Sequence, residues 1–144
     1  IGSFVFGRLR SIFGNYRRVV IFGSLGVILL LIILSTITKV PTIYLYFLFC
    51  ILGFFGAFSV ALLSHYQVLF DKEYMGRALS TANFFNFGGV FLIQWLTGKI
   101  IYFMGGNSDG ASIEAYRVAF IFIAILLSIS LCIYLFSDEK KKCF

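Results

Sequence analysis

The sequence predicts an all-α integral membrane fold with four transmembrane helices, and three observations support this: overall composition, the lengths of the charge-free segments, and the pattern inside them. Of the 144 residues, 60% are hydrophobic and 12% are charged, with a mean hydropathy of +0.99. An ordinary soluble domain carries about twice that share of charge. Too little polar surface remains to cover a water-exposed globule, so a soluble enzyme is not expected.

Each charge-free segment is at least 20 residues long, and the four segments are 19–38, 40–70, 78–98 and 118–137. A helix rises about 1.5 Å per residue, so roughly 20 residues cross the ~30 Å hydrocarbon layer. Residues 27–34 are apolar at every position, so this segment does not show the alternation of apolar and polar residues that is typical of a membrane barrel. The expected spans are 19–38, 40–64, 79–104 and 116–136.

The segments outside the spans carry basic residues unequally. One side receives the end of a preceding helix with a basic loop (1–18), a second loop (65–78) and the tail (137–144). The other side receives residue 39 and the glycine-rich loop 105–115. Nine basic residues fall on the first side, against Lys39, Lys99 and Arg117 on the second. The positive-inside rule therefore makes the first side cytoplasmic, with both ends of the chain there.

The chain reads as a fragment of a longer bacterial membrane protein. Residue 1 is Ile, and the apolar residues 1–6 suggest the end of an earlier helix. Abundant Phe, Ile and Lys with a single Pro is typical of an AT-rich bacterial genome, so the inner membrane is the expected location.

The net charge of +6 predicts anionic lipid headgroups as the partner, and no nucleic acid, because the basic residues lie beside the spans. Metal-ligand spacing, a nucleophile with its base and a phosphate-cradling glycine motif are all missing from the sequence. No cofactor, metal or catalytic residue is therefore expected. No charged residue lies at the central depth of a span, and His65 lies at one end of the second, so no intramembrane proton relay is expected.

The third span carries a polar stripe. On a helix its polar side chains share an arc of about 120°, and they are Ser80, Asn83, Asn86, Gln94 and Thr97. An amide left without a partner in hydrocarbon costs several kcal/mol, so the stripe is expected to face other helices or a water-filled path. Two interpretations remain open: the amides bridge helices by hydrogen bonds, or they line a route for a solute.

Small residues predict where helices approach each other. In the second span Gly53, Ala57 and Ala61 recur every four residues, which favours close helix packing. Gly88 and Gly89 in the middle of the third span predict a bend or a close neighbour. The first and fourth spans are almost wholly aliphatic and aromatic, with a few hydroxyl residues that can bond to their own helix. These two spans are expected to face mostly lipid.

Residues 7–18, with the sequence GRLRSIFGNYRR, resemble the cytoplasmic loop signature of the major facilitator superfamily. Gly7, Leu9 and Gly14 match it, and Arg17 and Arg18 supply its basic cluster two positions late. Ser11 replaces the family's acidic residue, as in the degenerate copy in the carboxyl half of these carriers. Further on, Gly76 and Arg77, followed by Asn83 and Asn86 of the polar stripe, resemble the loop and helix that begin the eleventh span.

The resemblance implies that the chain runs from the end of the eighth span through the twelfth of a 12-span transporter. In that fold the ninth and twelfth helices are peripheral, and the tenth and eleventh approach the central cavity. The implied activity is transport of a small solute by alternating access, with the N-terminal half of the same carrier as partner. The two inner loops would gate the inner mouth through Gly7, Gly14, Arg17, Arg18, Gly76 and Arg77.

Three other classes compete with a carrier. A four-helix membrane adaptor or assembly protein without transport is the main alternative. A small dimeric multidrug exporter would be expected to carry a membrane-embedded carboxylate, which this sequence lacks. A membrane enzyme is least expected, because no catalytic constellation is present.

Overall fold

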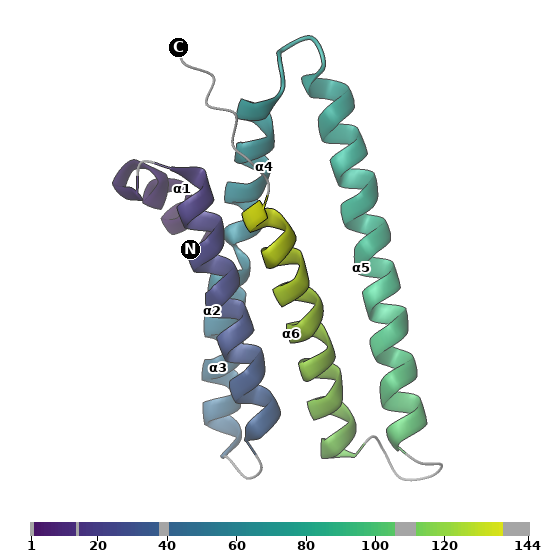
Figure 1. The fold of residues 1–144 in the computed structure, drawn as a ribbon. Helices are drawn as coiled ribbons and strands as arrows, with labels where there is room; N and C mark the ends of the chain where they lie inside the picture. The colour runs from purple at the N-terminus through teal and green to yellow at the C-terminus, as the bar shows by residue number, and fades with distance from the viewer. Residues whose placement is uncertain (1, 14, 38–40, 106–111, 137–144) are drawn as a thin grey trace.

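The computed structural model describes residues 2–13, 15–37, 41–105 and 112–136, with the side chains of 9–13, 65–69 and 105 left aside. Figure 1 shows these residues as a bundle of helices, and no strand occurs among them. The helices are α1 (Gly2–Phe13), α2 (Tyr16–Thr36), α3 (Thr42–Gly56), α4 (Phe58–Leu69), α5 (Met75–Gly105) and α6 (Ile113–Phe136).

Four segments in the described residues are long and apolar enough to cross a membrane: Tyr16–Thr36, Thr42–Ser64, Met75–Met104 and Ile113–Phe136. The most apolar 18-residue stretch of the third segment is less apolar than that of the other three, so the span with the polar stripe is the least apolar. These segments confirm the predicted all-α membrane fold.

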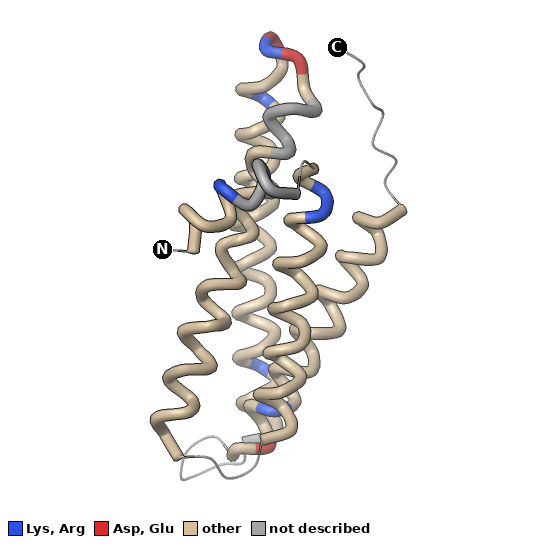
Figure 2. The backbone as a smooth tube through the Cα atoms, turned by 90° about the vertical axis from the view of Figure 1, so that its left-hand side faces the viewer, with Lys and Arg blue, Asp and Glu red and all other residues tan. Residues whose placement is uncertain are grey.

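Charged residues lie toward the two ends of the bundle, as Figure 2 shows. The loop between α4 and α5 and the start of α2 lie toward one end, whereas the end of α5 and the start of α6, which contain Lys99 and Arg117, lie toward the other. Lys39, Gly14 and the tail from residue 137 lie outside the described residues. The separation of charge along the bundle leaves the middle of each span for hydrocarbon.

Local hydrogen bonds explain where α2 and α6 begin. The Asn15 side chain caps α2 by accepting from the Arg17 backbone N–H at 3.0 Å. The Ser112 hydroxyl accepts from the Ala115 N–H at 3.2 Å, and Glu114 adds a negative charge to the first turn of α6. Both helices therefore satisfy part of their free N-terminal donors.

The second span is broken at Ala57, which the sequence analysis did not predict. Ala57 has ψ near −5°, and its N–H donates to the Phe54 carbonyl at 3.3 Å. The Val60 N–H in turn donates to the Ala57 carbonyl at 3.1 Å. Both bonds join residues three apart, so the helix tightens for one turn between α3 and α4. α1 packs on this break, because a Cβ added at Gly2 would lie 3.0 Å from the Phe54 oxygen.

The hydrophobic core lies where α1, α2 and α4 meet, with Phe6, Val19, Val20 and Ala61 buried in it. Glycines of α2 admit aromatic rings from the second span. A Cβ added at Gly23 would lie 2.3 Å from Phe58 Cβ, and one at Gly26 would lie 2.3 Å from Phe55 Cδ1.

α2 is the most buried of the four spans. Of the most apolar 18-residue stretch in each span, 44% is buried in α2, 17% in α6, 6% in Thr42–Ser64 and none in Met75–Met104, within the described residues. The physical reason is the pair of glycines at 23 and 26, which lets rings reach the backbone of α2. The hydroxyls of the first and fourth spans do bond to their own helices as expected: Ser24 to Ile21, Ser35 to Ile32, Thr36 to Ile33 and Ser128 to Ala124.

Some of the residues assigned to helix packing do not approach another helix in the described structure. Ala61 lies in the core and Ala57 packs against it. A Cβ added at Gly53, Gly88 or Gly89 would instead meet no heavy atom within 4 Å. α5 also continues as helix through Gly88 and Gly89. The close contacts at glycine therefore lie in α2, and the helix break lies at Ala57. Neither involves Gly53, Gly88 or Gly89.

Antiparallel α2 and α6 lie side by side (Figure 1) and are joined at both ends by arginines. Arg17, in the first turn of α2, donates from Nη2 to the Leu135 carbonyl near the end of α6. Arg117, near the start of α6, donates from Nη2 to the Thr36 carbonyl at the end of α2, at 2.7 Å. Each cation thus satisfies a carbonyl at the negative end of the neighbouring helix.

Candidate functional site

Two of the predicted path residues, Asn83 and Asn86, come together in one pocket between α4 and α5. This polar pocket has a volume of about 460 Å³ and is lined by Ser59, Leu62, Leu63, Ala82, Asn83, Phe85 and Asn86. Asn83 is half-buried and Asn86 is exposed. The two amides share a face because they are three residues apart on a helix. Neither has a side-chain hydrogen-bond partner among the described residues.

The structure does not bring the other three predicted path residues into this pocket. The Thr97 hydroxyl donates within its own helix, to the carbonyls of Ile93 at 2.8 Å and Gln94 at 3.0 Å. Ser80 and Gln94 are exposed and do not line the pocket. Amide bridges between helices, the first of the two interpretations, are not formed by Asn83, Asn86 or Gln94 within the described part of the chain.

Ser59 is the polar pocket residue that the sequence analysis missed. It lies on α4 with Leu62 and Leu63 at spacings of three and four, which puts the three on one face. By helical spacing that face lies opposite the stripe of small residues through Ala57 and Ala61, which packs in the core. The sequence shows the spacing of Ser59, Leu62 and Leu63, but it does not indicate which neighbouring helix Ser59 faces.

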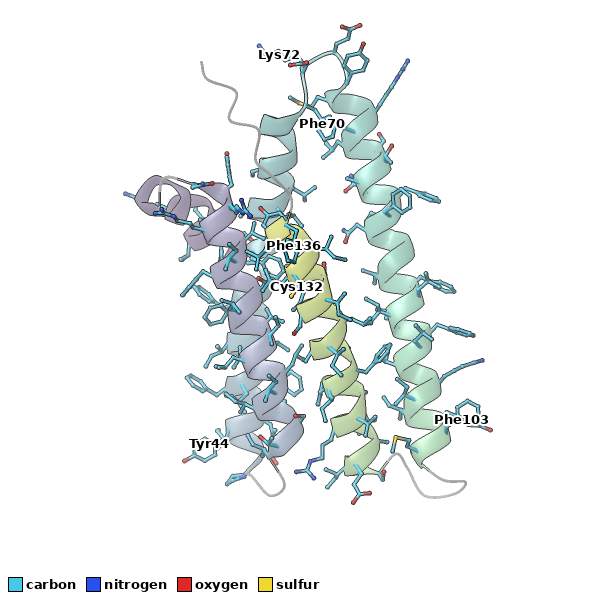
Figure 3. The ribbon with its side chains drawn as sticks, viewed as in Figure 1. Tyr44, Phe70, Lys72, Phe103, Cys132 and Phe136 are labelled. Atoms are coloured by element: carbon cyan, nitrogen blue, oxygen red, sulfur yellow. The ribbon has the colours of Figure 1, made fainter. Side chains whose placement is uncertain are left out.

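A second pocket lies at the start of α5, beside the loop that precedes this helix. It has a volume of about 620 Å³ and is lined by Phe70, Asp71, Tyr74, Arg77, Ala78, Thr81, Ala82 and Phe85. The Asp71 carbonyl accepts from the N–H groups of Tyr74 and Met75, both at 3.0 Å, and so fixes the turn into α5. Figure 3 labels Phe70 and Lys72 at this end of the molecule. Arg77, a predicted gating residue, therefore lines a cavity, whereas its neighbour Gly76 is exposed.

Of the other predicted gating residues that the structure describes, Gly7 lies within α1, and Arg17 and Arg18 lie in the first turn of α2. Gly7 is exposed, with open space around it. Arg17 is half-buried and bonds to the Leu135 carbonyl of α6. Arg18 is exposed. The structure therefore gives Arg17 a contact between helices that the loop signature did not predict.

The chemistry available in the polar pocket is neutral hydrogen bonding. Two amides and one hydroxyl both donate and accept, and the other lining residues are apolar. Among the described residues, no group of three or more His, Cys, Asp or Glu side chains could hold a metal ion. A pocket of this composition can hold a small polar molecule through reversible contacts.

Fold and pocket together define a helical membrane protein with several spans and a solute-sized polar pocket between two of them. A family model described as Major Facilitator Superfamily matches residues 1–142. The chain belongs to this family of membrane transporters, whose members move small solutes rather than catalyse chemical conversions. Among curated proteins and among solved structures, no match to the chain was found.

Proposed function

We propose that this chain is the C-terminal portion of a solute carrier, from the end of the eighth span through the twelfth, and that the polar pocket binds the transported solute. The observation that carries this proposal is the convergence of Ser59, Asn83 and Asn86 on one pocket between two spans. Amide side chains within a membrane span cost free energy unless their donors and acceptors form hydrogen bonds. A polar solute that visits the pocket supplies the missing hydrogen bonds.

The mechanism proposed is alternating access. The N-terminal half of the same carrier would close over the polar pocket from the opposite side, and rocking of the two halves would open it to each face in turn. The exposure of α5 supports this, because no residue in its most apolar 18-residue stretch is buried in the described structure. A second half would cover part of that surface.

The proposed orientation puts the end with Arg17, Arg18 and Arg77 on the cytoplasmic side of a bacterial inner membrane. Anionic headgroups there would attract these cations, each by about 1 kcal/mol near the surface. Gly7, within α1, and Gly76, in the first turn of α5, both lie in open surroundings, so neither would hinder movement at the inner mouth.

Substitution of the two amides tests the solute site in the complete carrier. The probe is the first solute in a panel of small uncharged sugars, polyols and amides that raises the carrier's unfolding temperature. Asn83→Leu and Asn86→Leu should each lower uptake of that solute into vesicles at least about tenfold, since a lost hydrogen bond to a buried polar group costs about 1–3 kcal/mol. Uptake at the original rate in both variants overturns the assignment.

Ser128→Leu is the matched control. Ser128 bonds to its own helix and lines an open apolar groove of about 660 Å³ between α2 and α6, so a leucine fits there. Uptake by this variant should stay within about twofold of the parent, because surface substitutions usually change stability by under about 0.5 kcal/mol.

The coding sequence upstream of residue 1 tests the placement in the carrier. An in-frame extension encoding about seven further spans is expected, because each half of such a carrier has about six. A start codon directly before residue 1 would favour the four-helix adaptor instead.

A further inference from the structure

The pocket at the start of α5 combines charged, hydroxyl and apolar side chains. Its charged groups are the Asp71 carboxylate and the Arg77 guanidinium, and its hydroxyl groups come from Tyr74 and Thr81. The remaining lining residues are apolar: Phe70, Ala78, Ala82 and Phe85. An open pocket of about 620 Å³ with both signs of charge beside apolar walls fits a ligand that has a zwitterionic part and an apolar part.

The length of the third span puts the charged part of this pocket at the membrane surface. The segment Met75–Met104 has 30 residues. Such a helix is about 45 Å long, whereas the hydrocarbon layer is only ~30 Å thick. The ends of α5 therefore extend into the headgroup layers. Arg77 lies in the first turn of α5, directly after the loop that contains Asp71. Both charged groups are therefore at the depth of lipid headgroups.

The pocket changes from polar to apolar along α5. One face of the helix, at spacings of three and four, carries Tyr74, Arg77, Thr81 and Phe85. Phe85 comes eight positions after Arg77, which is about 12 Å further toward the middle of the membrane. A phospholipid has the same order of groups: a charged headgroup, then polar glycerol esters, then acyl chains.

The charges in the pocket favour a zwitterionic headgroup over an anionic one. The guanidinium of Arg77 is a planar fork of N–H donors that matches the oxygens of a phosphate. The Asp71 carboxylate, which lines the same pocket, attracts an ammonium group and repels a second negative charge. The start of α2 is different, because Arg17 and Arg18 lie there and its first turn contains no acidic residue. The two inner arginine sites therefore suit different lipids.

The apolar end of the pocket continues as a surface that an acyl chain can cover. The Phe85 side chain is 70% exposed. Gly88 and Gly89 follow it at spacings of three and four, and a Cβ added at either glycine would meet no heavy atom within 4 Å. A chain seated on the Phe85 ring therefore has an unobstructed path over the two glycines toward the middle of the membrane.

We propose that the pocket at the start of α5 binds one phospholipid with a zwitterionic headgroup. Arg77 binds the phosphate, Asp71 binds the ammonium group, and an acyl chain lies over Phe85 and the two glycines. The proposed solute pocket shares Ala82 and Phe85 with this site but contains neither charged group. The lipid site does not depend on the proposed function, because it requires no solute. It selects a lipid by both of its charges, unlike the general attraction of anionic headgroups to the inner arginines.

Quenching by brominated lipids tests the site in the complete carrier. Phe85→Trp places a fluorescent reporter beside the acyl chain, after Trp95 and any tryptophan elsewhere in the carrier are replaced by Phe. The carrier is reconstituted in phosphatidylglycerol vesicles with increasing amounts of phosphatidylethanolamine that has brominated chains. In the mirror experiment the bromines are on phosphatidylglycerol within phosphatidylethanolamine. Half-maximal quenching should need at least about fivefold less brominated phosphatidylethanolamine than brominated phosphatidylglycerol, equivalent to about 1 kcal/mol.

Three variants in this background assign the preference to the pocket. Arg77→Gln and Asp71→Asn should each abolish it, because each leaves one charge of the headgroup without its partner. Lys72→Gln is the matched control: Lys72 is a cation of the same loop, labelled in Figure 3, and it does not line the pocket. This variant should keep the full preference. Equal unfolding temperatures across the set exclude a general loosening of the fold.

The other outcomes overturn the proposal in distinct ways. Equal quenching by the two lipids, or stronger quenching by phosphatidylglycerol, removes the zwitterionic site. A loss with Lys72→Gln as large as that with Arg77→Gln assigns the effect to the general charge of the loop. Soluble glycerophosphoethanolamine, at the same concentration as the lipid, should not reverse the quenching, because it has no acyl chains. Full reversal would assign the pocket to a soluble phosphate ester. The solute site is tested separately, by uptake in the Asn83 and Asn86 variants.

Discussion

α2 and α5 are both spans of one chain, yet they relate to the bundle in opposite ways. α2 contacts α1, α3, α4 and α6, and its glycines are filled by aromatic rings. α5 contacts mainly α4 and α6 among the described helices, with open space at its central glycines. The hydroxyls of α2 bond to their own helix, whereas Asn83 and Asn86 of α5 face a pocket. In this chain, therefore, the helix that holds the fold together is distinct from the helix with the candidate chemistry.

The outer surface of α5 shows what this separation requires. Large aromatic side chains there are at least half exposed, including Phe84, Phe87, Phe91 and Trp95. Such a large apolar surface is covered by lipid or by another part of the protein, because its exposure to water is unfavourable. In a carrier, the tightly packed α2 would hold one half together, and the exposed surface of α5 would face the central cavity between the two halves.

The largest expected effect contrasts glycines of the two helices. Gly23→Ala should destabilise the fold by about 1–3 kcal/mol, since its Cβ would overlap Phe58. Gly89→Ala should be neutral or stabilising by up to about 1 kcal/mol, since alanine favours the helix and nothing lies nearby. The free energy of unfolding in mixed micelles measures both. Similar losses at the two positions would mean that α5 is packed as tightly as α2.

A smaller effect is expected from the arginines that join α2 and α6. Arg17→Met and Arg117→Met should each cost about 1 kcal/mol of unfolding free energy, because each leaves a helix-end carbonyl without its donor. The two costs should add, because the contacts lie at opposite ends of the helix pair.

Arg18→Met serves as the control for these two variants. Arg18 neighbours Arg17 in sequence but is exposed, so its replacement should change stability by less than about 0.5 kcal/mol. A loss at Arg18 as large as at Arg17 would assign the effect to general charge at that end rather than to the contact with α6.

The sequence predicted the fold class and the four spans because charge-free length is a one-dimensional property. It also predicted that the hydroxyls of α2 and α6 bond to their own helices, which depends on residues three or four apart. It did not predict the break at Ala57 or the burial of α2, because these depend on which rings from other helices meet a glycine. Asn83 and Asn86 were readable from helical spacing. Ser59 was not, because its place in the pocket requires knowing that α4 faces α5.

The smallest expected effect compares two cations at the same end of the bundle. Lys99 Nζ lies 4.2 Å from the centroid of the Trp95 ring, one turn away on the same helix. Lys99→Met should therefore cost no more than about 0.5–1 kcal/mol, the range for an exposed cation–π contact. Trp95 is the only tryptophan of the 144 residues, so with any tryptophan elsewhere in the carrier replaced by Phe, its fluorescence should change with this substitution. Arg117 instead bonds across to α2. If Lys99→Met cost more than Arg117→Met, α5 would be held by contacts beyond its own helix, and the contrast with α2 would fail.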